Sequence, residues 1–222
     1  MARIELFRMV HKGLRAELYS AVTLAGRTDF RNSAEAARVA AAALRLLELL
    51  EEHAAHEDEV VLPQLSALVP EFHAALQTDH ARLKALQDDV RQFAARLQAA
   101  AGDAEREALG GRLHNRLGRL TADHLVHMQR EELEGNRALW AYRTDEELLA
   151  LRRRIADRVP PARKPAWLAL MLAAGSLPER AELLAGLRAL LPDPVFRDVT
   201  APARAALGEA CWSEVARAAG CE

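Results

Sequence analysis

Aromatic residues are scarce in this chain of 222 residues, at 5%, although half of the residues are hydrophobic. Most of the hydrophobic positions are Ala or Leu. Ala, Leu, Arg and Glu are the residues with the highest helix propensity, and all four are frequent here. The composition therefore favours helices over sheets and predicts an all-α protein.

The chain also lacks an excess of charge, a cysteine motif and a long apolar run. Lys and Arg total 30 against 32 for Asp and Glu, a formal charge of -2, which gives no electrostatic reason to expect a nucleic-acid partner. Cys211 and Cys221 form no CxxC motif and do not look like a disulfide framework. The most apolar run, 167–174, is far shorter than the ~20 residues that cross a bilayer. The N-terminus also lacks the layout of a signal peptide, so we expect a cytoplasmic protein without a membrane partner.

Apolar residues recur at steps of three and four along four long segments, which is the pattern of amphipathic helices. The segments cover about 4–22, 34–62 and 70–102, and a fourth carries Leu113 to Glu131. Asn32 or Ser33 can cap the second helix, and glycines at 110, 111 and 118 weaken the fourth. Four long helices with short connections predict an up-down-up-down four-helix bundle, whose interior commonly holds metals.

After residue 143 the helices become shorter and contain no histidine. Thr144 and Glu147 form a capping-box pattern, and Ser176 offers a second helix start. We therefore predict two parts: residues 1–143 as the bundle with its site, and residues 144–222 as a C-terminal helical extension packed on it.

Histidine and glutamate occur together on two of the long segments. His53 and Glu57 lie one helical turn apart, as do His127 and Glu131, and both pairs fall among apolar positions. An ionised carboxylate on a core-facing position is costly without a partner. All eight histidines lie in the four long segments: His11, His53, His56, His73, His80, His114, His124 and His127. Two inward His-xxx-Glu pairs on separate helices predict a dinuclear metal centre.

The residue types narrow the choice of metal. Imidazole and carboxylate ligands suit iron, manganese or zinc, and the sequence does not separate these three. Glu57 and Glu131 can bridge two ions. Few ligands per ion leave open positions where a small molecule binds, an arrangement that suits iron and oxygen.

These residues follow one pattern along the chain: His11, His53-xxx-Glu57-Asp58, Pro63, Asp79-His80 and His127-Met128-xx-Glu131-Glu132. Over roughly residues 1–140 the pattern resembles the hemerythrin-like (HHE cation-binding) domain. The resemblance implies a four-helix bundle with an oxo- or hydroxo-bridged non-heme diiron site that meets O2, peroxide or NO. It further implies that His11 and His53 bind one iron, His80 and His127 bind the other, and Glu57 and Glu131 bridge them.

The sequence departs from the oxygen-carrying hemerythrins, which have a second His one turn from the ligand on the third helix. Here those positions are Leu76 and Lys84, so we expect reactive or sensing chemistry in preference to O2 carriage. His124, one turn before His127, is the candidate for an additional ligand. Glu132 is the alternative to Glu131 as the second bridging carboxylate.

Two functions remain open at the level of the sequence, beside a metal-free bundle whose polar interior only fixes the register of the helices. The first is a diiron protein that binds or reduces O2, peroxide or NO in oxidative or nitrosative stress. The alternative is a metal- or redox-dependent sensor without turnover, in which the helices of residues 144–222 contact a protein partner. The sequence does not decide whether the protein is an enzyme.

Overall fold

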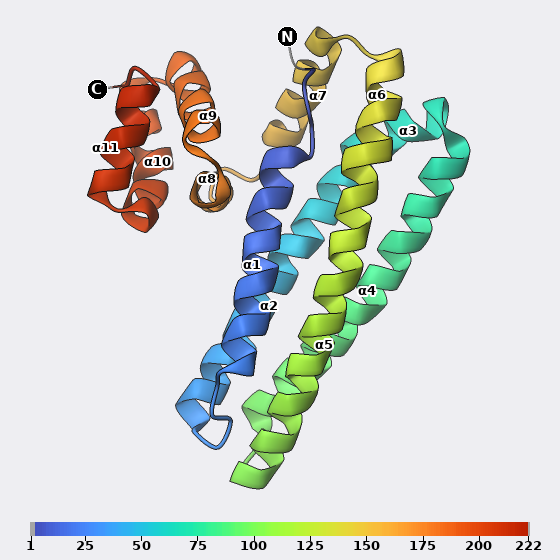
Figure 1. Ribbon diagram of the computed structural model, residues 1–222, viewed down its shortest axis with the longest axis vertical. Helices are drawn as coiled ribbons and strands as arrows, with labels where there is room; N and C mark the ends of the chain where they lie inside the picture. Colours follow the sequence, from blue (N-terminus) through green and yellow to red (C-terminus); the bar gives the residue numbers. More distant parts are fainter. Residues whose placement is uncertain (1–2, 222) are drawn as a thin grey trace. The chain divides into compact units, whose positions relative to one another are not determined.

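Helices account for the regular structure of this chain, and the computed structural model describes residues 3–221. No strand occurs within that range. Four long helices run alternately in opposite directions (Figure 1). They are α1 (Arg8–Gly26), α2 (Ser33–His56), α4 (Pro70–Ala99) and α5 (Asp103–Arg130). The prediction of an all-α protein is confirmed for the described residues.

Two of the long helices continue through a π turn into a short helix. The turn η1 (Glu57–Val61) joins α2 to α3 (Leu62–Leu68), and η2 (Glu131–Gly135) joins α5 to α6 (Asn136–Tyr142). The segment predicted as one helix over 34–62 is therefore interrupted at Glu57. A π turn holds one residue more than an α turn and often marks a functional site.

Side-chain caps fix where several helices begin. The Oδ1 atom of Asn32 accepts hydrogen bonds from the amides of Ala34 and Glu35, at 3.0 and 3.2 Å, which confirms Asn32 as a cap. The predicted capping box at Thr144 and Glu147 is also formed, with hydrogen bonds of 2.8 and 3.3 Å. These bonds satisfy amides that have no partner within a first helical turn.

Two compact units divide the described chain. The first unit comprises residues 3–5 and 15–151, and the second unit comprises residues 6–14 and 152–221. The helix α1 therefore contributes to both units. The first unit continues past residue 143 because the guanidinium of Arg3 donates to Asp145 Oδ1, at 2.8 Å, and Leu148 is buried. The first residues of α7 (Asp145–Arg158) therefore belong to the first unit.

The interior of the first unit consists mainly of leucines from the long helices. Fully buried examples are Leu18, Leu46, Leu50, Leu76, Leu113, Leu117 and Leu120. A side chain of this size contributes about 1.5–3 kcal/mol when it is removed from water. The apolar stripes that predicted the helices are thus the surfaces that pack against one another.

The second unit is built from short helices around a separate apolar core. They are α8 (Lys164–Ala174), α9 (Leu177–Leu190), α10 (Asp193–Leu207) and α11 (Glu209–Ala218). Their shared core contains Leu168, Leu172, Leu184, Phe196, Ala203, Trp212 and Val215. Within residues 3–221 no helix combines the length and the apolar character that a bilayer-spanning segment needs.

Gly110 allows a close approach between α5 and the loop before α2. A Cβ atom at this position would overlap the ring of Phe30, which is buried. We expect Gly110→Ala to lower the free energy of unfolding by about 1–3 kcal/mol, because the ring has to move within a packed core. Urea denaturation measures the effect.

The neighbouring Gly111 is the matched control for this substitution, because a Cβ there would meet nothing within 4 Å. Gly111→Ala should raise the free energy of unfolding by up to about 1 kcal/mol, since Ala is the better helix former. Equal effects of the two substitutions would contradict the role given to Phe30. The sequence pattern identified these glycines only as weak points of the helix.

Glu179 lies at the centre of a cluster of ion pairs in the second unit. Its carboxylate lies 2.7 and 2.6 Å from Lys12 Nζ and 2.9 Å from Arg8 Nε, and it accepts from the amide of Ser176 at 2.8 Å. Burial raises the pKa of Glu179, but Lys12 and Ser176 outweigh that effect and hold the pKa at about 2. The ion pairs therefore stabilise the unit above pH 4.5, and this contribution is lost as the pH falls towards 2.

We expect Glu179→Gln to lower the free energy of unfolding by about 1–2 kcal/mol at pH 7, after allowance for the partial exposure of Lys12. The difference from the native protein should shrink towards zero near pH 2. Glu182→Gln, at an exposed position of the same helix, should have no comparable effect. A loss that is the same at both pH values would exclude the ion pairs as its source.

Candidate metal centre

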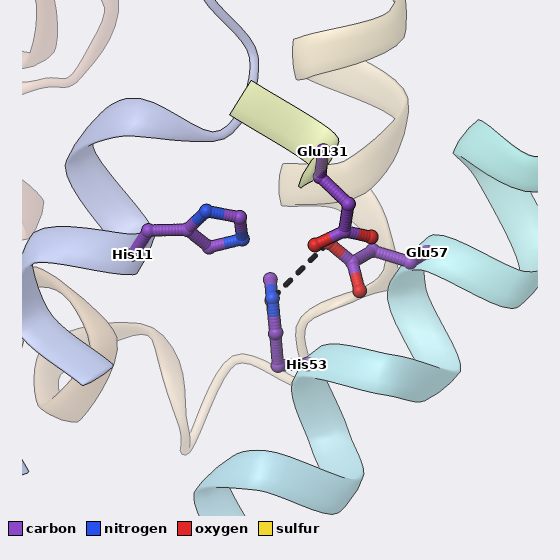
Figure 2. A group of neighbouring side chains, drawn as sticks. All are labelled: His11, His53, Glu57 and Glu131. Atoms are coloured by element: carbon purple, nitrogen blue, oxygen red, sulfur yellow. Dashed lines mark ion pairs between the residues drawn. The ribbon is translucent and has the colours of Figure 1, made fainter. Parts of the chain in front are cut away.

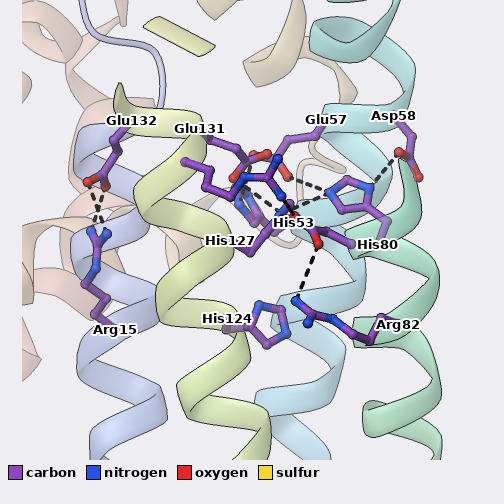
Figure 3. Close-up of polar contacts among 12 residues, drawn as sticks. Arg15, His53, Glu57, Asp58, His80, Arg82, His124, His127, Glu131 and Glu132 are labelled. Atoms are coloured by element: carbon purple, nitrogen blue, oxygen red, sulfur yellow. Dashed lines mark hydrogen bonds and ion pairs between the residues drawn. The ribbon is translucent and has the colours of Figure 1, made fainter. Parts of the chain in front are cut away.

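Four donor residues of the first unit meet in its interior. His80 comes from α4, His127 from α5, and Glu57 and Glu131 are the first residues of the two π turns. One ligand atom from each of the four lies within 4.8 Å of the others (Figure 3). His127, Glu57 and Glu131 are buried and His80 is half-buried. The four side chains therefore converge on one point in the interior of the first unit.

The separations between these donor atoms fit coordination of a shared ion. His80 Nε2 lies 3.1 Å from His127 Nε2 and 3.7 Å from Glu57 Oε2, and His127 Nε2 lies 3.4 Å from Glu131 Oε2. Two ligand atoms that each lie ~2.1 Å from one ion, at angles near 90–110°, are about 3.0–3.4 Å apart. These atoms are thus close to the spacing that a metal ion requires.

His53 brings a further imidazole to the same carboxylates. Its Nε2 atom lies 3.1 Å from Glu57 Oε1, whereas the other oxygen of Glu57 faces His80. Figure 2 shows the imidazole of His53 beside the carboxylates of Glu57 and Glu131. Ligand atoms of these three residues also lie within 4.8 Å of one another, so they form a second donor group. Glu57 and Glu131 belong to both donor groups, as a bridging role requires.

His11 falls in residues 6–14, which are part of the second unit. The arguments below therefore rest on the donors of the first unit: His53, Glu57, His80, His127 and Glu131. Of the six ligands predicted from the sequence, these five come together in the first unit.

Two acidic residues outside the donor groups lie beside the imidazoles of His80 and His127. Asp58 Oδ1 lies 2.9 Å from Nδ1 of His80. A proton on Nδ1 then leaves the lone pair of Nε2 directed towards the centre. Asp79 Oδ2 lies 3.7 Å from Nδ1 of His127 and is itself held by Arg130 at 2.5 Å. Both imidazoles thus have a carboxylate on the side away from the donor groups.

Burial sets the charge states of the donors. It lowers the pKa of His127 to about 3, so this imidazole is neutral and available as a ligand at neutral pH. Burial, and next the carboxylate of Glu57, raise the pKa of Glu131 well above its usual value. The neutral imidazole of His127 cannot compensate the charge of a buried carboxylate beside it, whereas a cation can. These buried His and Glu groups could hold a metal ion.

Two candidates that the sequence left open lie outside both donor groups. Glu132 forms a two-pronged ion pair with Arg15, at 2.6 and 3.0 Å, on the far side of α5 from His80 (Figure 3). Glu131 is therefore the carboxylate that joins the groups. His124 is buried, but its ring centre lies 6.5 Å from that of His127, and its Nε2 atom lies 3.4 Å from Gln87 Nε2. It is a neighbour of the site.

Three other histidines also fall outside the groups. His56, His73 and His114 are half-buried, and none of them belongs to either donor group. Asp58 and Asp79 appeared in the sequence pattern without a role of their own. Their position next to Glu57 and His80 could have indicated this role, because a polar partner for a ligand imidazole is a regular feature of metal sites.

Comparisons with protein-family models, with known proteins and with solved structures find no match for this chain.

Proposed function

We propose that this chain is a hemerythrin-like non-heme diiron protein that binds or reacts with O2, peroxide or NO. In this proposal α1, α2, α4 and α5 form the up-down-up-down bundle around the site. The observation that carries the proposal is the sharing of Glu57 and Glu131 between two groups of donors of the first unit, with one oxygen of Glu57 facing His53 and the other facing His80. A single ion would need only one such group.

The donor set favours a pair of ions that retain open positions. The first unit offers three imidazoles and two carboxylates, fewer than two octahedral ions would need. Mixed imidazole and carboxylate ligation with open positions is typical of non-heme iron, and manganese or zinc share the same ligand types. An iron pair held by these residues would supply electrons for the reduction of O2 or peroxide and positions for NO.

The residues of the chain have separate tasks in this proposal. Asp58 holds the ring of His80, and Asp79 lies behind His127 with the support of Arg130. Glu57 presents one carboxylate oxygen to His53 and the other to His80. Buried leucines at 50, 83 and 120 limit the access of bulk water. The donors are therefore held in place before an ion binds.

Metal analysis and an optical spectrum test the proposal directly. The full chain, purified without chelator, is expected to contain about two iron ions per molecule and to develop visible absorption after exposure to O2. Assays of peroxide and NO consumption then separate turnover from binding alone. A protein that takes up no metal, or that binds only one ion per chain at saturation, would refute the diiron assignment.

A further inference from the structure

A hollow in the first unit connects the donor groups to the surface. It has a volume of ≈ 430 Å³, and α2, η1, α4 and α5 supply its walls. Four of the donors face it: His53, Glu57, His80 and His127. Leu50, Ala54, Ala81 and Leu83 form its sides, while Glu51 and Lys84 lie at its exposed end. A molecule in this hollow would therefore reach the ions directly.

The hollow is larger than a diatomic ligand needs. One water molecule takes about 30 Å³ in the liquid, so the hollow corresponds to more than ten waters. Its lining includes three small side chains, Ala54 and Ala55 on α2 and Ala81 on α4. Pockets of about 300–1,000 Å³ with mainly apolar walls usually hold organic ligands. The volume and the walls therefore favour a small organic molecule.

The charges around the hollow favour an anion at its inner end. Two divalent ions would bring four positive charges, against three negative charges on Glu57, Glu131 and Asp58, so an excess of about one remains at the centre. The exposed end has no such excess. There Lys84 pairs with Glu51 and Asp88, at 3.3 and 2.7 Å, and Arg91 pairs with the same two carboxylates, at 2.8 and 2.9 Å. The attraction for a negative charge thus comes from the centre.

We propose that the hollow binds a small monocarboxylate with a short aliphatic chain. Its carboxylate would face the ions of the centre, and its chain would lie against Leu50, Ala54 and Leu83. Gln87 and His124 are the buried polar residues of the wall outside the donor groups, and they provide hydrogen bonds beside the carboxylate. This inference rests on the proposed metal centre and names the class of molecule that the centre takes.

Binding of acetate, butyrate and hexanoate to the iron-loaded full chain tests the inference. Each buried methylene should tighten binding by about fourfold, so hexanoate should bind at least ~10-fold more tightly than acetate. The dissociation constants come from calorimetry and from changes in the optical spectrum. Hexanoate that binds no more tightly than acetate would overturn the inference.

Two variants that fill the hollow from opposite helices supply the control. Ala54→Leu and Ala81→Leu should each weaken hexanoate binding by at least ~10-fold and change acetate binding by less than about twofold, with the metal content unchanged. Ala74→Leu, at an exposed position of α4 outside the hollow, should change neither. Unchanged hexanoate binding in both filling variants would also overturn the inference.

The same measurements distinguish a failure of the proposed function from a failure of this inference alone. A chain that binds no metal fails the proposed function and this inference together. A chain that binds two ions and a diatomic ligand such as NO, but no carboxylate, keeps the proposed function and refutes the inference alone.

Discussion

Glu131→Ala is expected to lower the metal content of the chain below about one ion, whereas His80→Ala should leave about one. Glu131 contributes to both donor groups, so its removal takes a ligand from each of them. His80 belongs to only one group, and the group of His53, Glu57 and Glu131 keeps its ligands in its absence. Elemental analysis of the purified variants, after dialysis against a small excess of metal, measures the difference.

The adjacent carboxylate supplies the control for this experiment. Glu132 pairs with Arg15 and lies outside the donor groups, so Glu132→Ala should retain the metal content of the native protein. The two substitutions remove the same chemical group from neighbouring positions. Equal metal loss in both, or equal loss in Glu131→Ala and His80→Ala, would show that the carboxylates are not shared as proposed.

Without metal, Glu131→Gln is expected to stabilise the protein, by roughly 1–4 kcal/mol at neutral pH. Burial and the carboxylate of Glu57 raise the pKa of Glu131, so the folded chain keeps a proton that the unfolded chain has released above pH 4.5. The free energy of unfolding of the metal-free protein should therefore fall as the pH rises above 4.5. The amide of Gln carries no charge and removes this dependence.

Urea denaturation in the presence of a chelator, at pH 5 and pH 8, measures both effects. The gain from Glu131→Gln should be larger at pH 8. With metal in excess the order should reverse, because only the native protein gains about 2.7 kcal/mol or more from ligand present at 100 times its dissociation constant. A variant that is less stable than the native protein in chelator at both pH values would contradict the electrostatic cost assigned to Glu131.

The periodicity of the sequence was sufficient to predict the long helices, because each of them buries one stripe of leucines. It was also sufficient for the pairs His53/Glu57 and His127/Glu131, since residues four apart share a helix face. It could not choose between Glu131 and Glu132, which are adjacent and chemically identical. That choice depends on where the π turn begins and on the ion pair that Arg15 forms with Glu132.

Other features depend on contacts between segments that are distant in sequence. The hollow beside the site is lined by residues of α2, η1, α4 and α5, among them Ala54 and Ala81, and no local pattern brings these elements together. The division of the chain into two units cuts through α1, whose apolar stripe continues without a break. The boundary expected after residue 143 was based on a change of composition. The contacts between residues extend the first unit to Leu151.

The two π turns require a fixed number of residues at two places in this protein. Each turn carries one residue beyond the α-helical count, immediately after His56 and after Arg130. A π turn takes up its extra residue with little change in the rotation of the helix beyond it, so deletion of a single residue from Glu57–Val61 would let the segment revert to an α-helix. Substitutions at exposed positions of these turns can drift over evolution, but a deletion would remove the π turn that begins at a shared carboxylate.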